Sequence, residues 1–282
     1  MGGVSRSNFI PVSTFTSCIF AFCMIKITTR PLIMITNDDG ITAPGIRNLV
    51  EAAEPYGDLV IVAPDSPQSG MGHAITISKP LRLDKTDVFP HHTAYMCSGT
   101  PVDCVKLAVD KVLHRKPDIL LSGINHGSNS SINVIYSGTM SAAVEGAIEG
   151  IPSAGFSLLD YNYDADFSFA KEAARWTIER MLKFGLGKGT LLNVNIPKVT
   201  INEAKGYRIC RQANAKWKES FDERVDPNNR KYYWLRGEFE YLDKGTDTDE
   251  WALKNGYVSV VPVHYDLTAH HELKKLEKWT KH

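Results

Sequence analysis

The sequence predicts an α/β protein built on a doubly wound, mostly parallel sheet, followed by a C-terminal antiparallel β extension. Short apolar runs typical of buried strands alternate with amphipathic helical patterns up to about residue 198. Several of these runs end in turns rich in Asp, Asn, Ser and Gly. Beyond residue 198 the helical periodicity fades, and aromatic residues mixed with charges indicate extended arms.

The first predicted strand, residues 32–36, is followed directly by Asn37, Asp38, Asp39 and Gly40. Adjacent side chains on a strand point to opposite faces, so the two carboxylates converge only if the backbone turns, as Gly40 permits. Two such carboxylates repel each other, and a hard cation such as Mg²⁺ or Mn²⁺ removes that conflict. The alternative is a solvated turn that caps the next helix.

The next segments bring a second loop to the same edge of the sheet. Residues 44–54 are predicted as a helix and residues 58–63 as a second buried strand. The Pro-, Gly- and Ser-rich loop that follows contains Ser69. Because a helix joins these strands in parallel, both loops leave the sheet on one side. Residues 74–96 alternate apolar and polar positions and are predicted as a β excursion.

Three further features lie at the ends of predicted core elements. Gly99 and Thr100 precede a predicted helix over residues 101–113, and Asn125 follows a buried strand over residues 118–123. The sequence Ser137-Gly138-Thr139 opens another helix, where free backbone N–H groups at the positive end of the helix suit a phosphate. Plain capping of that helix is the alternative.

The C-terminal part of the chain has a different character. Residues 200–262 contain no convincing helix and many aromatic residues. Aromatic residues within a polar rim are typical of subunit interfaces, so this arm is predicted to mediate oligomerisation. The other predicted elements are strand 152–158, helix 167–184, strand 191–196, strand 257–263 and helix 270–279.

We therefore divide the chain into residues 31–198 as the catalytic core and residues 199–282 as a β-arm extension with a closing helix. Residues 1–30 are an N-terminal extension whose status the sequence leaves open. They weakly resemble a signal peptide without a clean cleavage site, and a natural start at Met24 is the alternative.

Charge, apolar runs and cysteine content indicate which partners and which cellular location to expect. The chain of 282 residues carries 32 basic and 32 acidic side chains, which argues against binding to polymeric nucleic acid. No run approaches the roughly 20 apolar residues of a membrane span, so no membrane partner is expected. The five cysteines are odd in number and lack zinc-type spacing, which favours reduced thiols and a cytoplasmic location.

The predicted loops gather oxygen donors at one edge of the sheet. The loop features are Asp38-Asp39, Ser69, Gly99-Thr100 and Asn125, and together they offer two carboxylates, a hydroxyl and a side-chain amide. A set without thiolate or required imidazole favours Mg²⁺ or Mn²⁺ over Zn²⁺. We expect one divalent cation per subunit.

At this point the chain resembles the survival protein SurE family of metal-dependent 5′/3′-nucleotidases, also described as acid phosphatases. The matching segments occur in the family's order and cover most of residues 32–270. They are TNDDG (36–40) with APG (43–45), VAPDSPQSG (62–70), GTPVDCV (99–105), SGINHGSN (122–129), YSGTMSAAVEG (136–146) and YVSVVPVHYDLTAH (257–270).

The resemblance implies a Rossmann-like core and a C-terminal β extension exchanged between subunits of a homodimer, often within a homotetramer. It implies that Asp266 and His270 order this extension. The implied metal ligands are Asp38, Asp39, Ser69 and Asn125, and the implied phosphate contacts are Ser137, Gly138 and Thr139. We also expect substrate contacts from Asn37, Gly99 and Thr100.

Four positions depart from the family's pattern or have an ambiguous role. Ser66 and Gln68 stand where some members carry basic residues, so an arginine contact to substrate is not expected there. His126 follows the Asn ligand and is either a general acid or a hydrogen-bonding support. His73 is likewise either a general acid or a hydrogen-bonding support.

The function that follows from this resemblance is hydrolysis of nucleoside 5′-monophosphates, with 3′-monophosphates as second candidates. Asp38, Asp39 and Asn125 are the expected catalytic residues. The nucleophile is either an activated water or Asp38 itself, which would form an aspartyl-phosphate.

Two alternatives remain at the level of sequence. A haloacid-dehalogenase-type phosphatase also begins with an Asp after its first strand, but its DxDGT motif separates the carboxylates that are adjacent here. A non-catalytic nucleotide-binding module would be expected to lack a metal ligand, and none of the four is missing.

Overall fold

The computed structural model describes residues 30–280. The expectations for residues 1–30, including a start at Met24, therefore lie outside the described residues apart from Arg30. Among the described helices, none is both long enough and apolar enough to cross a bilayer.

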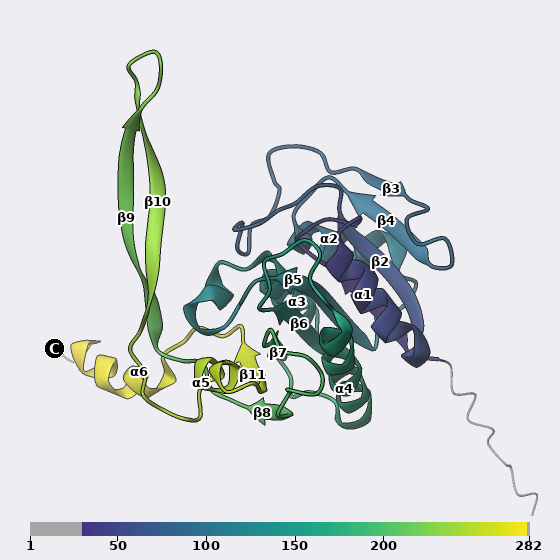
Figure 1. The fold of residues 1–282 in the computed structure, drawn as a ribbon. Coiled ribbons are helices and arrows are strands. Elements are labelled where there is room, and N and C mark those ends of the chain that lie inside the picture. Colours follow the sequence, from purple (N-terminus) through teal and green to yellow (C-terminus); the bar gives the residue numbers. More distant parts are fainter. Residues whose placement is uncertain (1–29, 281–282) are drawn as a thin grey trace, which may run out of the picture.

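The predicted α/β fold is confirmed, and its centre is a nine-stranded sheet in the order β3-β4-β2-β1-β5-β6-β7-β11-β8 (Figure 1). Neighbours from β4 to β7 pair in parallel, whereas β3 pairs antiparallel with β4 and β11 pairs antiparallel with β7. The strands are β1 (Leu32–Thr36), β2 (Asp58–Pro64), β3 (Leu83–Lys85), β4 (Thr93–Cys97), β5 (Ile119–His126), β6 (Ser153–Leu158), β7 (Thr190–Ile196), β8 (Tyr207–Ile209) and β11 (Val258–His264).

Helices cover both faces of this sheet, as a doubly wound fold requires. Helices α1 (Pro44–Ala53) and α4 (Ser168–Phe184) contact each other over one face, and α2 (Pro101–Leu107) and α3 (Gly138–Ile148) contact each other over the other. Strand β1 serves both layers, because Ile33 and Ile35 belong to one buried cluster and Met34 to the other. This alternation explains why the strand is apolar at its first four positions, Leu32 to Ile35.

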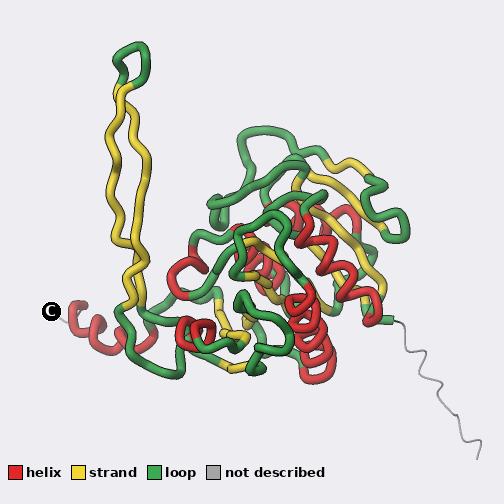
Figure 2. The backbone as a smooth tube through the Cα atoms, viewed as in Figure 1, coloured by secondary structure: helices red, strands yellow, loops and turns green. Residues whose placement is uncertain are grey.

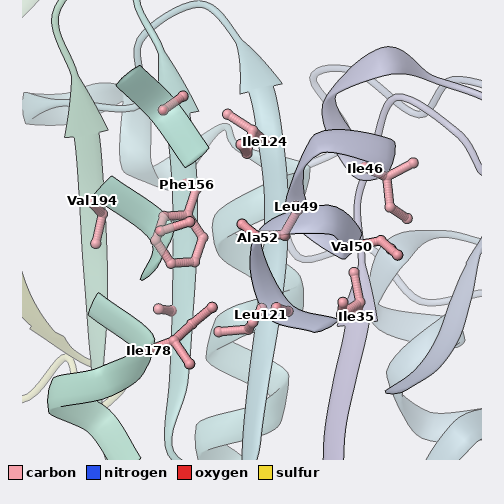
Figure 3. Close-up of a cluster of buried hydrophobic side chains, with 14 of the residues drawn as sticks. Ile35, Ile46, Leu49, Val50, Ala52, Leu121, Ile124, Phe156, Ile178 and Val194 are labelled. Carbon is pink, nitrogen blue, oxygen red and sulfur yellow. The ribbon is translucent and has the colours of Figure 1, made fainter. Parts of the chain in front are cut away.

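Figure 3 shows the larger cluster, where Ile46 and Leu49 of α1 and Ile178 of α4 lie near Leu121 and Phe156 of the sheet. Phe156 is among the largest fully buried side chains in the described part of the molecule. The close packing of this layer fixes the strand ends from which the loops emerge.

Two expectations about secondary structure need correction. The predicted excursion over residues 74–96 contains only the short β3 as an added strand, and residues 93–97 form β4, which pairs with β2 inside the sheet. The segment 200–262 does contain a helix, α5 (Asp249–Lys254). Its six residues are too few for a visible period, and the signal lies in its cap, since Thr248 accepts a hydrogen bond from the Trp251 N–H.

The antiparallel extension is confirmed as a hairpin of β9 (Ala215–Val225) and β10 (Lys231–Tyr241) that projects from the body of the protein (Figure 2). The chain then returns through α5 to β11, beyond the predicted core boundary at residue 198, and β11 pairs with β7. The described chain ends in α6 (His270–Leu276) and a short 3₁₀ turn (Glu277–Thr280).

Helix α1 lies against the end of β5 at Gly45. A Cβ atom at this position would come within 1.9 Å of the Ile124 backbone carbonyl oxygen. No side-chain rearrangement relieves a clash with backbone, so either the helix or the strand end must shift.

We therefore expect Gly45→Ala to lower the free energy of unfolding by about 1–3 kcal/mol or more. Gly187→Ala is the matched control, because its added Cβ would meet Thr190 Oγ1 at an ordinary 3.5 Å. Urea denaturation of both variants measures the difference. Equal stabilities would contradict the close approach of α1 to β5.

Candidate active site at the carboxyl edge of the sheet

Three neighbouring strands, β2, β1 and β5, end at the same edge and deliver the loops that carry the predicted ligands. Thr36, the last residue of β1, lies opposite Ser122 of β5. The loop after β2 reaches back to β1, because the Gln68 N–H donates to the Asp38 carbonyl oxygen at 2.8 Å. The predicted convergence of these loops is therefore present in the structure.

Asp38 is 4% exposed and lies against the first turn of α3. Its Oδ1 accepts a hydrogen bond from the Thr139 hydroxyl. A Cβ atom on Gly138 would come within 2.7 Å of Asp38 Cβ, so only glycine fits this approach. Burial, followed by the charge of Asp39, raises the pKa of Asp38 to about 6, although the bond from Thr139 opposes the shift.

Asp39 is the second carboxylate of the pair. Its Oδ2 is buried and has no hydrogen-bond partner among residues 30–280. Burial raises its pKa, and the charge of His126 acts in the opposite direction. A buried carboxylate oxygen without a partner is unfavourable unless a ligand satisfies it, so the pair fits a bound cation.

Asn125 and His126 occupy the end of β5. The Asn125 amide nitrogen donates to the Gly127 carbonyl at 3.1 Å, and within the described chain nothing donates to its Oδ1. That oxygen is therefore available as a ligand. His126 Nδ1 lies 3.3 Å from the Asp160 carbonyl oxygen, and the ring packs edge-on against Phe167 at 5.2 Å.

The Ser137-Gly138-Thr139 turn begins α3 as predicted. Ser137 Oγ accepts from the Met140 N–H at 3.0 Å and caps the helix. This cap leaves the N–H groups of Gly138 and Thr139 in the first turn without an intrahelical acceptor, and the backbone of Thr139 interacts with the Asp38 carboxylate and lowers its pKa. The arrangement suits an anionic group beside the carboxylates.

Ser69, Gly99 and Thr100 are less directly connected to this edge. Ser69 lies in an exposed loop, and its hydroxyl makes no hydrogen bond to the part of the chain that the structure describes. The Thr100 hydroxyl donates to the Ala74 carbonyl at 2.7 Å and caps α2, and Gly99 lies against Asp103. These contacts give Gly99 and Thr100 a structural role.

Asn37 has a mixed position at this edge. Its Nδ2 donates to the Gly40 carbonyl at 2.9 Å and closes the turn after β1. Its Oδ1 is buried and, in the range that the structure covers, lacks a partner. The amide therefore supports the carboxylate pair and can still accept from a ligand.

A buried asparagine network was missed by the sequence reasoning. Asn129 donates through Nδ2 to Ser157 Oγ, and its backbone N–H donates to Asn195 Oδ1, both at 2.8 Å. Asn193 donates to the Asn129 carbonyl at 2.8 Å. Together they hold the loop after β5 on β6 and β7. The signal was available, since the strand sequence around Asn193 and Asn195 places amides on a buried face.

His73 does not contact the carboxylate pair. Its Nε2 lies 3.0 Å from Glu145 Oε2, and Lys106 Nζ lies 2.6 Å from Glu145 Oε1. The Glu145 side chain is only 2% exposed. It therefore connects the segment after the Ser69 loop to both α3 and α2, which sequence reasoning also missed because Glu145 lies within an apolar helix face.

Asp266 and His270 contact each other at 2.9 Å near the start of α6, on the surface of the subunit. Hydrogen bonds from Thr268, together with His270, hold the pKa of Asp266 well below its usual range. The pair closes the turn that leads into α6.

The donor set fits a hard cation and not a zinc site. Within residues 30–280 there is no cluster of three or more His, Cys, Asp or Glu side chains arranged to hold a metal. The site has two carboxylates, with an amide oxygen and a nearby hydroxyl-bearing loop, and such oxygen ligands favour Mg²⁺ or Mn²⁺.

Comparisons with known proteins agree with the resemblance seen in the sequence. The model of the family described as "Survival protein SurE" matches residues 33–219. A protein named 5′-nucleotidase SurE from Christiangramia forsetii is 61% identical over 253 residues, which are 89% of this chain and 97% of that protein. One of the same name from Bacteroides fragilis is 46% identical over 253 residues, 89% of this chain and 98% of that protein. The crystal structure of the SurE protein from Aquifex aeolicus is 39% identical with a TM-score of 0.78, covering 88% of this chain and 99% of that one.

Glu145 gives a prediction about stability and pH. Burial opposes ionisation of this side chain, but the bonds from His73 and Lys106 outweigh it and lower its pKa below the usual 4.5. Its stabilising effect is therefore present above pH 4.5 and is lost as the pH falls through the lowered value.

We expect Glu145→Gln to lower the free energy of unfolding by about 1–3 kcal/mol at pH 7, with the difference from wild type shrinking as the pH falls below 4.5. Urea denaturation across pH 3–8 measures this. Glu172→Gln, on the exposed face of α4, should change stability by less than about 0.5 kcal/mol. A difference for Glu145→Gln that does not vary with pH would refute the role of its charge.

Proposed function

This chain belongs to the survival protein SurE family of 5′-nucleotidases and is a phosphomonoesterase, and we propose that its activity depends on a divalent cation held by Asp38, Asp39, Ser69 and Asn125. The substrates are nucleoside 5′-monophosphates, with 3′-monophosphates as second candidates. The observation that carries this proposal is the contact of the Gly138-Thr139 turn with buried Asp38, whose neighbour Asp39 is half-buried, because it puts a helix end suited to an anion beside a carboxylate pair suited to a cation. Because the chain belongs to the SurE family, the haloacid-dehalogenase alternative is excluded.

Different groups of the protein contact different parts of the phosphate. When bound, Mg²⁺ or Mn²⁺ supplies positive charge that offsets the negative charge on the phosphoryl oxygens. The N–H group of Gly138, at the start of α3, donates to a remaining phosphoryl oxygen. Thr139 also fixes Asp38 through its hydroxyl, so Asp38 is held as a ligand. This restraint favours water over Asp38 as the nucleophile.

His126 is a supporting residue in this scheme. Its ring is oriented by the Asp160 carbonyl and by Phe167, and its Nε2 is buried without a partner in the described structure. It lies near enough to Asp39 for its charge to affect the pKa of that carboxyl. Because Nδ1 donates to the Asp160 carbonyl, Nε2 is an acceptor in the neutral ring, and it donates to the leaving oxygen only when the ring is protonated.

The hairpin of β9 and β10 supports a dimer or a tetramer. An isolated two-stranded hairpin is marginal in water, and this one exposes large apolar side chains, including Phe221, Trp234 and Leu235. We propose that it packs on another subunit.

The described cysteines, Cys97, Cys104 and Cys210, are unpaired, which accords with the proposed cytoplasmic location.

Removing one carboxylate tests the metal site. We expect Asp39→Asn to reduce phosphate release from AMP by at least about 100-fold, because the cation loses a charged ligand. EDTA should abolish wild-type activity, and added Mn²⁺ or Mg²⁺ should restore it. Asp84→Asn, on the exposed edge strand β3, should keep full activity. Wild-type activity that persists in EDTA would refute the proposed metal dependence.

A charged substitution on the apolar surface of the β9–β10 hairpin tests whether the hairpin packs on another subunit. Leu235 is 57% exposed, and we expect Leu235→Lys to shift the protein to a smaller species because a lysine cannot be buried in the interface. Light scattering after size exclusion measures the mass. Lys231→Ala, at the far end of β10, should leave the assembly unchanged. A monomeric wild-type protein would contradict the proposal.

A further inference from the structure

The loop between β5 and α3, residues 127–136, connects the two halves of the proposed site. It follows the end of β5, where Asn125 lies, and it leads to Ser137, the cap of α3. Its start is fixed by the sheet, because Asn125 pairs with β6. Its second half is the short 3₁₀ helix η3 (Ser131–Ile135), whose position sets how the chain enters the phosphate turn.

Ser131, the first residue of η3, has a backbone conformation that residues with a side chain rarely adopt. Its φ is 53°, in the left-handed region, and the residue is fully buried. Such a conformation persists only where surrounding contacts stabilise it. Two contacts do so here: the Ser131 N–H donates to Asp249 Oδ2 at 2.8 Å, and the Ser131 hydroxyl donates to the Ala213 carbonyl oxygen at 2.9 Å.

Asp249 is a buried carboxylate that the mechanism above does not use. It is the first residue of α5 and is fully buried. Its Oδ1 accepts from the Ala213 N–H at 2.9 Å and from the Glu250 N–H at 2.8 Å, while its Oδ2 accepts from Ser131. Burying a carboxylate is costly unless its oxygens are hydrogen-bonded, and here backbone donors occupy both. This one side chain therefore joins η3, α5 and the segment that precedes β9.

The same loop also contacts the foot of the β9–β10 hairpin. Ala213 lies just before β9, and in Figure 1 α5 lies close to the end of the hairpin that joins the body. Trp217 of β9 donates through Nε1 to Asn133 Oδ1 at 2.8 Å. The position of η3 therefore depends on α5 and on the hairpin, although both follow it by more than 70 residues in the sequence.

We propose that Asp249 is a positioning residue for phosphate binding: by holding η3 in its buried conformation it sets Ser137 and Gly138 in place beside Asp38. The proposal rests on the phosphate site proposed at the start of α3 and adds a residue outside that site. Asp249 acts through the loop and does not touch the substrate. Because Asn125 is held by the sheet, the cation ligands do not depend on this connection. Asp249 therefore supports phosphate binding and leaves cation binding unaffected.

The test compares phosphate affinity with cation affinity in one variant. Asp249→Asn keeps the size of the side chain but turns an amide donor toward backbone N–H groups that the carboxylate accepts. We expect this variant to raise the inhibition constant of inorganic phosphate, measured against AMP hydrolysis, by about three- to tenfold. The Mn²⁺ concentration that gives half-maximal activity should stay unchanged.

Asp247→Asn is the matched control. It makes the same chemical change just before α5, on an exposed side chain that bonds to Arg211 at the surface. Both constants should remain at their wild-type values in this variant. Thermal unfolding of each variant separates the two explanations: a merely structural Asp249 would lower the Tm on substitution but leave the inhibition constant of phosphate unchanged below that temperature.

Ser131→Ala is a second variant that decides the question if Asp249→Asn does not fold. It removes only the hydroxyl bond to the Ala213 carbonyl, and we expect the inhibition constant of phosphate to rise by about two- to threefold. An unchanged constant in the variants that fold, or an equal change in the phosphate and Mn²⁺ constants, would overturn the positioning role. A wild-type protein that releases no phosphate from AMP contradicts the function instead, so the two failures are distinct.

Discussion

The contact between Asp38 and the first turn of α3 is the constraint on which the rest of this site depends. A buried carboxylate next to a second carboxylate is costly, and the hydrogen bond from Thr139 offsets only part of that cost. The approach is possible because Gly138 has no side chain. This contact brings the oxygen-rich end of the sheet against the positive end of a helix, where we propose that the cation and the phosphate bind side by side.

The parallel sheet provides the platform for that contact. Strands β2, β1 and β5 end together, and a close approach of α1 to β5 at Gly45 fixes the strand end that carries Asn125. Polar ties then hold the loops: Gln68 binds the Asp38 carbonyl, and the asparagine network around Asn129 anchors the loop after β5. Loops of this kind are mobile unless such bonds restrain them.

The proposed phosphate site lies where Asp38 contacts the first turn of α3. Buried polar atoms without partners in the described structure, on Asn37, Asp39 and His126, concentrate at this edge. In a well-packed protein such atoms are rare, and their clustering marks where a ligand supplies the missing bonds. Glu145 lies outside this cluster, and its contacts with His73 and Lys106 make it a structural tie between the Ser69 loop and the helices.

The sequence alone determined the order of strands and helices in the core, the carboxylate pair after β1 and the cap that begins α3, because these depend on local periodicity and turn chemistry. It also carried the motifs that identify the family. It did not reveal α5, whose six residues carry no period, or the place of β4 inside the sheet. Only the tertiary structure decided that the Thr100 hydroxyl donates to the Ala74 carbonyl, that His73 pairs with Glu145 and that Tyr163 lines a cavity together with Asp39. Such contacts join residues far apart in the chain, and a side chain's partner across the fold depends on packing that no local pattern encodes.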